Sequence, residues 1–180
     1  KHNKHLFLER SKHIMRVYIS PSSQTENVGV GSYGTEAARM QQLSNIVVAA
    51  LRNMGHTVYG GDNSLTLSQR IQASNNTGVD CHVALHSNAG GGTGPEVWYY
   101  STSNNGKRLA QNILAEIEDV SGCPKSRGVK GSTDYAELKQ TSAPAVIVEV
   151  AFHDNASDVN WIIGHMNEIG QAIANGINAF

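Results

Sequence analysis

Short apolar runs alternate along the chain with longer segments of helical period from Met15 onward. This alternation is typical of βαβ units around a largely parallel sheet. The run at 145–150 is the most apolar, as expected for a central strand that is buried on both faces. The predicted strands are 16–20, 56–59, 81–86, 96–100 and 145–150.

The clearest helical pattern covers residues 35–54. Its apolar positions recur at intervals of three and one, which places them on one inward stripe. Gly55 follows the last periodic residue, where a helix is expected to stop. Three further helices are predicted at 67–73, 106–120 and 167–180. The stripe of the long helix consists of Met40, Leu43, Ile46, Val47, Ala50, Leu51 and Met54.

The predicted fold is therefore a single α/β domain over residues 15–180, a mostly parallel twisted sheet with helices on both faces. Residues 1–14 are rich in His and Lys and are interpreted as a tag remnant or disordered leader. Long Gly/Ser/Asn-rich loops occupy 22–34, 88–94 and 121–133. Two of them directly follow a strand, which is where open α/β sheets place their functional sites.

Composition narrows the possible partners. The formal net charge of -1 provides no basic field for nucleic acid, so no nucleic-acid partner is expected. No apolar stretch reaches the roughly 20 residues that cross a bilayer, and the start of the chain lacks a signal-peptide pattern. We expect that no segment inserts into a membrane. We also expect the protein to be a monomer. Cys81 and Cys123 are expected to be free thiols.

His82 and His86 are four residues apart, a spacing that would let both bind one zinc ion on a helix. The run is short and strand-like, however, and on a strand the two residues lie about 13 Å apart. A zinc ligand must come within about 2.1 Å of the metal, so the two cannot share an ion. His86, at the carboxyl end, is the better ligand, and His82 is expected to be hydrogen-bonded beneath the site. Since a lone histidine is weak evidence, a purely structural His86 is the alternative.

Two glutamates join His86 as candidates. Glu36 lies four residues before Met40 on the apolar stripe, so its carboxylate should point into the protein. Its alternative role is an acidic residue that the helix dipole favours at an N-terminus. Glu149 ends the most apolar strand, where a carboxylate is costly unless it is paired or protonated. Such burial can tune a general base, and a structural salt bridge is the alternative. His153 follows in the next loop and could bind substrate or metal.

Together these pieces resemble the zinc-dependent N-acetylmuramoyl-L-alanine amidases of the amidase 3 type, found among bacterial autolysins, sporulation hydrolases and phage endolysins. The resemblance rests on YISPSSQ at 18–24, on Glu36, on LHSNA at 85–89 and on LKQTSAPAVIVEV at 138–150. By position, it implies that Glu36 and His86 bind Zn²⁺ and that Glu149 is the catalytic acid/base.

One part of the family pattern is missing. The family usually has Asp-Pro-Gly-His after the first strand, whereas residues 20–23 read Ser-Pro-Ser-Ser, so one ligand histidine is absent. Gln24 could supply an amide oxygen, and some clostridial-type members look similar here. His153 is the alternative ligand if the final loop folds back over the site, and zinc binds His more often than oxygen ligands. The third ligand stays open between them.

The activity implied by the resemblance is hydrolysis of the amide between N-acetylmuramic acid and L-alanine in peptidoglycan, at the bacterial cell wall. Asn88 and the glycines after it could shape a groove for the substrate. A zinc peptidase acting on stem peptides would use a similar centre. A non-catalytic wall-binding module is a further alternative, motivated by the missing histidine. Burial of a carboxylate at Glu149 argues against a mere binder.

Overall fold

The computed structural model describes residues 13–180, which contain a six-stranded sheet. The strand order is β2-β1-β3-β6-β4-β5, and neighbouring strands are parallel except β4, which runs antiparallel to β6. The strands are β1 (Arg16–Pro21), β2 (Thr57–Gly60), β3 (Cys81–Asn88), β4 (Glu96–Tyr100), β5 (Val129–Ser132) and β6 (Ala145–Phe152).

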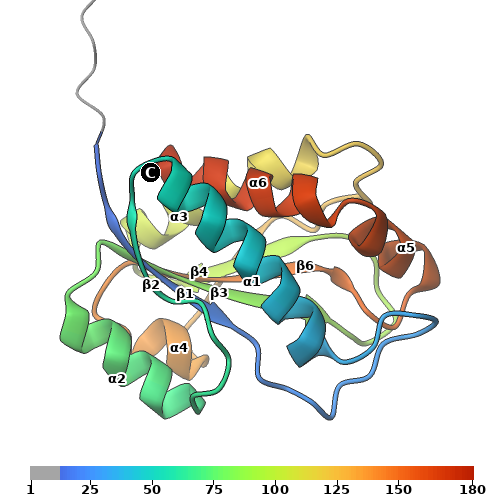
Figure 1. The fold of residues 1–180 in the computed structure, drawn as a ribbon, viewed down its shortest axis with the longest axis horizontal. Helices are drawn as coiled ribbons and strands as arrows, with labels where there is room; N and C mark the ends of the chain where they lie inside the picture. Colours follow the sequence, from blue (N-terminus) through green and yellow to red (C-terminus); the bar gives the residue numbers. More distant parts are fainter. Residues whose placement is uncertain (1–12) are drawn as a thin grey trace, which may run out of the picture.

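Helices cover both faces of this sheet (Figure 1). The helices α1, α3 and α6 pack together over one face, while the shorter α2 and α4 lie on the other. The predicted α/β class, the mostly parallel sheet and the two helical layers are thus confirmed. The helices are α1 (Glu36–Asn53), α2 (Leu67–Thr77), α3 (Asn104–Glu118), α4 (Ala136–Lys139), α5 (Ala156–Gly164) and α6 (Met166–Asn178).

Helix α1 forms where the apolar stripe predicts it. The Thr35 hydroxyl accepts a hydrogen bond from the Ala38 amide at 3.1 Å and caps the first turn. Gly55, at a φ of 97°, lets the chain leave the last turn in a conformation that other residues adopt only with strain. The stripe residues Met40, Leu43, Val47 and Leu51 are fully buried in the main core between α1, α3, α6 and the sheet. A smaller core lies on the other face, where Ala84, Leu138, Ala145 and Ile147 pack together.

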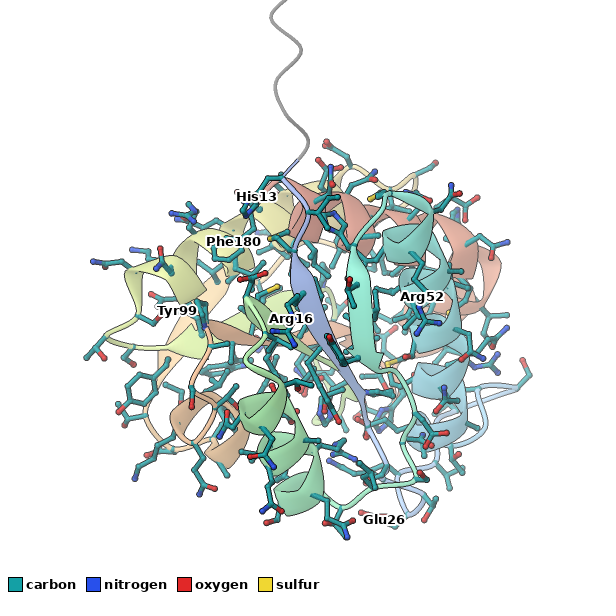
Figure 2. All side chains as sticks on the ribbon, turned by 60° about the vertical axis from the view of Figure 1, so that its left-hand side comes forward. His13, Arg16, Glu26, Arg52, Tyr99 and Phe180 are labelled. Atoms are coloured by element: carbon teal, nitrogen blue, oxygen red, sulfur yellow. The ribbon has the colours of Figure 1, made fainter. Side chains whose placement is uncertain are left out.

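One edge of the sheet is formed by β2 beside β1 (Figure 2). Arg16 begins β1, and its backbone amide donates to the Asp80 carboxylate at 2.7 Å. The Met15 amide donates to His56 Nδ1 at 3.0 Å, so the residue just before the strand is anchored as well. Residues 1–12 of the predicted leader lie outside the described residues.

Two parts of the element prediction were wrong or incomplete. Strand β5 lies inside the segment 121–133, which was predicted to be a loop. The strand was not predicted because its sequence VKGS has one apolar residue and edge strands need little burial. Helices α4 and α5 were not predicted. Helix α4 is too short to show a period, whereas α5 is set by its Asn155 cap, which accepts from the Asp158 amide at 3.0 Å.

Other expectations can be compared with the described part of the chain. Cys81 and Cys123 are free thiols, as predicted. None of the helices in residues 13–180 has the length and apolar character needed to cross a bilayer. The carboxyl ends of β1, β3 and β6 meet at one edge of the sheet, where the loop at 22–34 and the loop at 88–94 begin. Most of the candidate residues gather at this edge.

Candidate functional site

His86 and Glu149 lie side by side on adjacent parallel strands. They are register partners of β3 and β6, so their side chains project from the same face of the sheet. His82 lies four residues earlier on the same face of β3 and is fully buried, with its Nδ1 2.9 Å from Ser74 Oγ and its Nε2 2.7 Å from Glu137 Oε1. Its ring stacks on Tyr18 at 5.1 Å. The prediction that His82 is a hydrogen-bonded histidine beneath the site is confirmed.

Glu36 reaches this face from the first turn of α1. Its side chain is 1% exposed, and its Oε1 lies 2.9 Å from His86 Nδ1, so the structure joins the two predicted ligands directly. Burial alone would raise the pKa of Glu36, but hydrogen bonds from His86 and Asn27 lower it below the ordinary value. Burial lowers the pKa of His86, but the hydrogen bond to Glu36 and the charges of Glu149, Glu36 and Glu137 together raise it above the ordinary value. The pair therefore consists of a carboxylate and an imidazole held in direct contact.

Gln24 is connected to this pair through Asn27. The Asn27 amide donates to Glu36 Oε2 at 2.7 Å and also to Gln24 Oε1. Backbone contacts fix the loop, since the Glu36 amide donates to the Asn27 carbonyl at 2.8 Å and the Ala37 amide to the Gln24 carbonyl at 3.2 Å. The side-chain oxygen of Gln24 is thus brought close to Glu36. Sequence reasoning missed Asn27, although an Asn three residues after Gln24 in the same polar loop was a usable signal.

Glu149 has no lysine or arginine paired with it in the described part of the chain. Its Oε2 is buried and accepts no hydrogen bond from any described residue, and no Lys or Arg of residues 13–180 forms an ion pair with it. Burial raises the pKa of Glu149 to about 7, with the neighbouring His86 opposing the shift and the charges of Glu36 and Glu96 adding to it. The alternative role of Glu149, a structural salt bridge, is therefore not found among the described residues.

A second carboxylate, Glu96, lies on the other side of Glu149. It is the register partner of Glu149 on β4, and it is buried. Unlike Glu149 it is fully paired, with Arg127 Nε at 3.1 Å, with Lys130 Nζ, and with the Asn88 amide at 2.7 Å. Burial would raise the pKa of Glu96, but these cations lower it. Asn88, the last residue of β3, thus holds the Glu96 carboxylate next to Glu149. The position of Asn88 in the sequence did not predict this contact.

His153 is engaged elsewhere. Its Nδ1 lies 2.8 Å from Ser87 Oγ, and its ring packs against Tyr33 with centroids 5.8 Å apart. Ser87 follows His86 on β3, so its side chain points to the opposite face of the strand. The structure therefore brings Gln24, and not the His153 ring, into the hydrogen-bonded group around Glu36.

A cavity of about 300 Å³ opens over His86 and Glu149. Helices α2 and α4 form its walls, and its apolar surface comes from Leu67, Ala136 and Ile147. This volume is at the lower end of small-molecule sites, so it admits a short segment of a larger substrate. Its polar lining is provided by Ser23, Gln24, Arg70, His86, Tyr135, Glu137 and Glu149.

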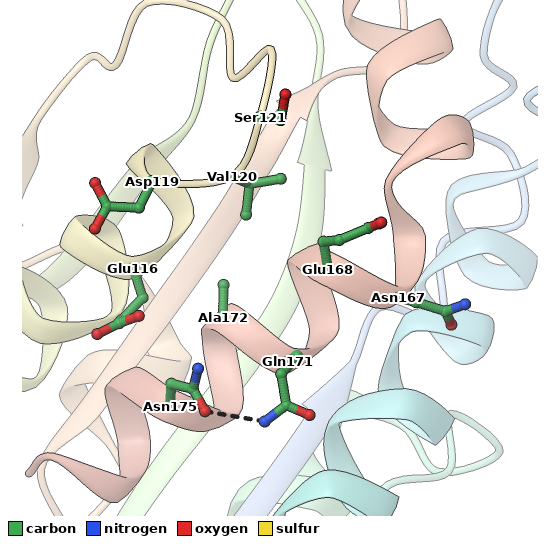
Figure 3. A pocket seen from close by; sticks show the side chains of 9 residues that line it. All are labelled: Glu116, Asp119, Val120, Ser121, Asn167, Glu168, Gln171, Ala172 and Asn175. Atoms are coloured by element: carbon green, nitrogen blue, oxygen red, sulfur yellow. Dashed lines mark hydrogen bonds between the residues drawn. The ribbon is translucent and has the colours of Figure 1, made fainter.

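A larger hollow of about 540 Å³ lies between α3 and α6 (Figure 3). It shares no residue with the cavity over His86. Its carboxylates, Glu116, Asp119 and Glu168, are not buried, and a hydrogen bond of 2.9 Å joins the Gln171 amide to Asn175 within α6. With no buried reactive group, this hollow lacks the features of a catalytic site.

The donor set around His86 suits zinc. One imidazole nitrogen and one carboxylate oxygen already lie 2.9 Å apart, with an amide oxygen linked to them through Asn27. Among residues 13–180 no three His, Cys, Asp or Glu side chains gather closely enough to hold one ion. Gln24, whose amide oxygen is linked to Glu36 through Asn27, is the candidate for a third protein donor. Beside this group lies Glu149, a partly buried carboxylate whose Oε2 is buried and has no partner among the described residues.

Comparison with known proteins adds independent information. A family model described as N-acetylmuramoyl-L-alanine amidase matches residues 17–179. The N-acetylmuramoyl-L-alanine amidase CwlM of Bacillus licheniformis is 26% identical over 179 residues, a match that covers 91% of this chain and 68% of that protein. The sporulation-specific N-acetylmuramoyl-L-alanine amidase of Bacillus subtilis is 24% identical over 175 residues, covering 91% of this chain and 67% of the relative.

Solved structures show the same fold. An N-acetylmuramoyl-L-alanine amidase from Clostridium difficile 630 superposes with a TM-score of 0.81 at 23% identity, covering 92% of this chain and 96% of that one. The catalytic domain of the amidase CwlV from Bacillus (Paenibacillus) polymyxa superposes with a TM-score of 0.80 at 21% identity. The match covers 92% of this chain and 97% of that one. The architecture that positions His86, Glu36 and Glu149 is therefore one that known amidases share.

Proposed function

The chain belongs to the N-acetylmuramoyl-L-alanine amidase family, and we propose that Glu36, His86 and Glu149 form its zinc-dependent catalytic centre. The reaction is hydrolysis of the amide bond between N-acetylmuramic acid and the L-alanine of the stem peptide in peptidoglycan. The family match lends no support to the peptidase or to the non-catalytic wall-binding alternative. The protein would act at the bacterial cell wall.

Glu36 and His86 would hold the zinc ion, with the amide oxygen of Gln24 as the third protein ligand. Support comes from the direct contact of the first two side chains and from the Asn27 bridge to the third. When bound, zinc supplies a Lewis acid that polarises the scissile carbonyl and lowers the pKa of the attacking water. Asn27 orients Glu36 and Gln24 by donating to both, as outer hydrogen bonds commonly do for metal ligands.

Glu149 would transfer the proton. The single observation that carries this role is its buried, unpaired Oε2 on the strand next to His86, facing the cavity. A carboxylate whose pKa lies at about 7 can accept a proton from water and return it to the leaving amine at neutral pH. Glu96 beside it cannot take this part, because Arg127 and Lys130 already neutralise its charge.

Purified cell walls provide the test. Glu149→Gln should slow the release of L-alanine amino groups from peptidoglycan by about 10²- to 10⁴-fold, the usual contribution of a positioned proton-transfer group. Glu118→Gln, an exposed glutamate near the end of α3, is the matched control and should retain full activity. The zinc content of both variants should equal that of the parent protein. Hydrolysis by Glu149→Gln at the parental rate would overturn the assignment.

A further inference from the structure

Arg70 is a buried cation in the wall of the catalytic cavity. Its side chain is 3% exposed, and it is the only buried lysine or arginine in the part of the chain that the structure describes. It lies in the first turn of α2, a helix that a reciprocal cap between Thr66 and Gln69 holds firmly in place. Arg70 lines the same cavity as His86 and Glu149.

The guanidinium of Arg70 is only partly satisfied. Its Nη1 donates to Ser23 Oγ at 3.1 Å and to the Leu65 carbonyl at 2.9 Å. Its Nε is buried and has no hydrogen-bond partner within residues 13–180. No carboxylate of the described chain forms an ion pair with it, since the four ion pairs found there involve His82, His86, Arg127 and Lys130.

The other charged groups around the cavity already have roles or partners. Glu137 binds His82 at 2.7 Å, and the His82 hydrogen bond keeps the pKa of Glu137 below its ordinary value in spite of burial. His86 binds Glu36, and Glu149 is assigned to proton transfer. Arg70 is thus the one charged group of the cavity that has neither an ion-pair partner among the described residues nor a role in the proposed reaction. A buried charge of this kind is costly unless a ligand of opposite charge pairs with it.

We propose that Arg70 binds a carboxylate of the stem peptide and so selects substrates that carry a free acid close to the scissile bond. The proposal rests on the amidase function, because that reaction fixes the chemistry of the two sides of the bond. The lactyl and sugar side offers no carboxylate, whereas the peptide side offers two besides the carboxylate at its C-terminus. They are the α-carboxylate of the D-glutamyl residue after L-alanine and the side-chain carboxylate of a diaminopimelate residue in third position.

Four soluble substrates distinguish the two carboxylates. They are C-terminally amidated muramoyl tripeptides with D-glutamate or D-isoglutamine in second position, each combined with L-lysine or meso-diaminopimelate in third position. Loss of the recognised carboxylate, by amidation in second position or by L-lysine in third position, should lower kcat/KM of the wild-type protein by about 10- to 100-fold, as expected for the loss of a charged hydrogen bond. Either position can prove to be the recognised one.

The variants Arg70→Met and Arg70→Lys separate recognition from a structural role. Arg70→Met should abolish the preference between acid and amide, while Arg70→Lys should keep part of it because a cation remains. A merely structural arginine would slow all four substrates equally in Arg70→Met. Arg52→Met, on the exposed face of α1, is the control and should leave the preference unchanged.

Binding keeps the proposal testable even if hydrolysis fails. Calorimetric titration of the zinc-loaded protein with the free tripeptides should show tighter binding of the acid than of the amide form, and Arg70→Met should remove this difference. Hydrolysis of none of the four substrates would contradict the amidase function and leave the binding result as the test of Arg70. Equal kcat/KM and equal binding of acid and amide by the wild-type protein would overturn the carboxylate site.

Discussion

Replacing Glu149 by Gln should stabilise the metal-free protein while it slows hydrolysis by the zinc-loaded protein. In the folded chain Glu149 has a buried oxygen without a partner, and burial raises its pKa from 4.5 to about 7. A raised folded-state pKa means that the neutral form is favoured by the fold. At a pH below the pKa of Glu149 in the unfolded chain, the group is neutral in both states and its ionisation costs the fold nothing. As the pH rises from that value, the folded state loses stability relative to the unfolded state, and the loss is complete above the folded-state pKa. The cost of Glu149 is therefore largest at alkaline pH.

The size of the effect follows from the shift in the pKa of Glu149. One pKa unit corresponds to about 1.4 kcal/mol, which gives a cost of about 3 kcal/mol above about pH 8 and about 1 kcal/mol near pH 5. Because solvent enters the cavity and screens the charge, we expect about 2 to 3 kcal/mol at the alkaline end. For a domain of this size, 1 kcal/mol changes Tm by about 2–4 °C, so Glu149→Gln should raise Tm by about 4–12 °C there.

Urea unfolding of chelator-treated protein near pH 5 and above about pH 8 measures this difference. The gain in unfolding free energy for Glu149→Gln over the parent should grow with pH. Glu118→Gln, which changes an exposed carboxylate, should show no comparable growth. Equal stability of Glu149→Gln and parent at both pH values, or a gain that shrinks as the pH rises, would refute the raised pKa of Glu149 in the folded protein.

Three further predictions concern the surroundings of the site. Glu137→Gln should lower the unfolding free energy by about 2–4 kcal/mol at neutral pH in denaturant titrations, because it breaks a buried pair. Since the pKa of Glu137 is lowered, this loss should shrink as the pH falls below the ordinary value of 4.5; a loss independent of pH would contradict the pairing. Gln24→Ala should weaken zinc binding about 10- to 100-fold in competition titrations while His153→Ala leaves it unchanged, and the reverse pattern would show His153 to be the ligand. Gly94→Ala should cost about 2–4 kcal/mol in thermal unfolding, because its φ is 92° and a Cβ would overlap the Lys125 carbonyl; Gly91→Ala, with open space around its Cβ, should cost less, and equal costs would refute the steric argument.

Local patterns were enough to predict much of this molecule. The period of 35–54 identified α1, and the apolar run at 145–150 identified the central strand β6, because burial imposes these patterns directly on the sequence. The inward stripe of α1 also predicted that Glu36 is buried. The short edge strand β5 and the single-turn α4 were not predicted from the sequence, since neither needs a periodic apolar face. The resemblance to the amidases, carried by the motifs around His86 and Glu149, predicted the family that the comparison then confirmed.

Only the tertiary structure decided which side chains meet. Asn27 and Gln24 lie in an aperiodic loop, and their contacts with Glu36 depend on how that loop folds back onto α1. Separation along the chain hides the Glu137–His82 pair, because the two residues come from a short helix and a distant strand. The same holds for Arg70, whose helical position looks ordinary until the fold buries it beside the cavity. A sequence determines which groups are apolar or charged, whereas the packing of distant segments determines which charges are left without a partner.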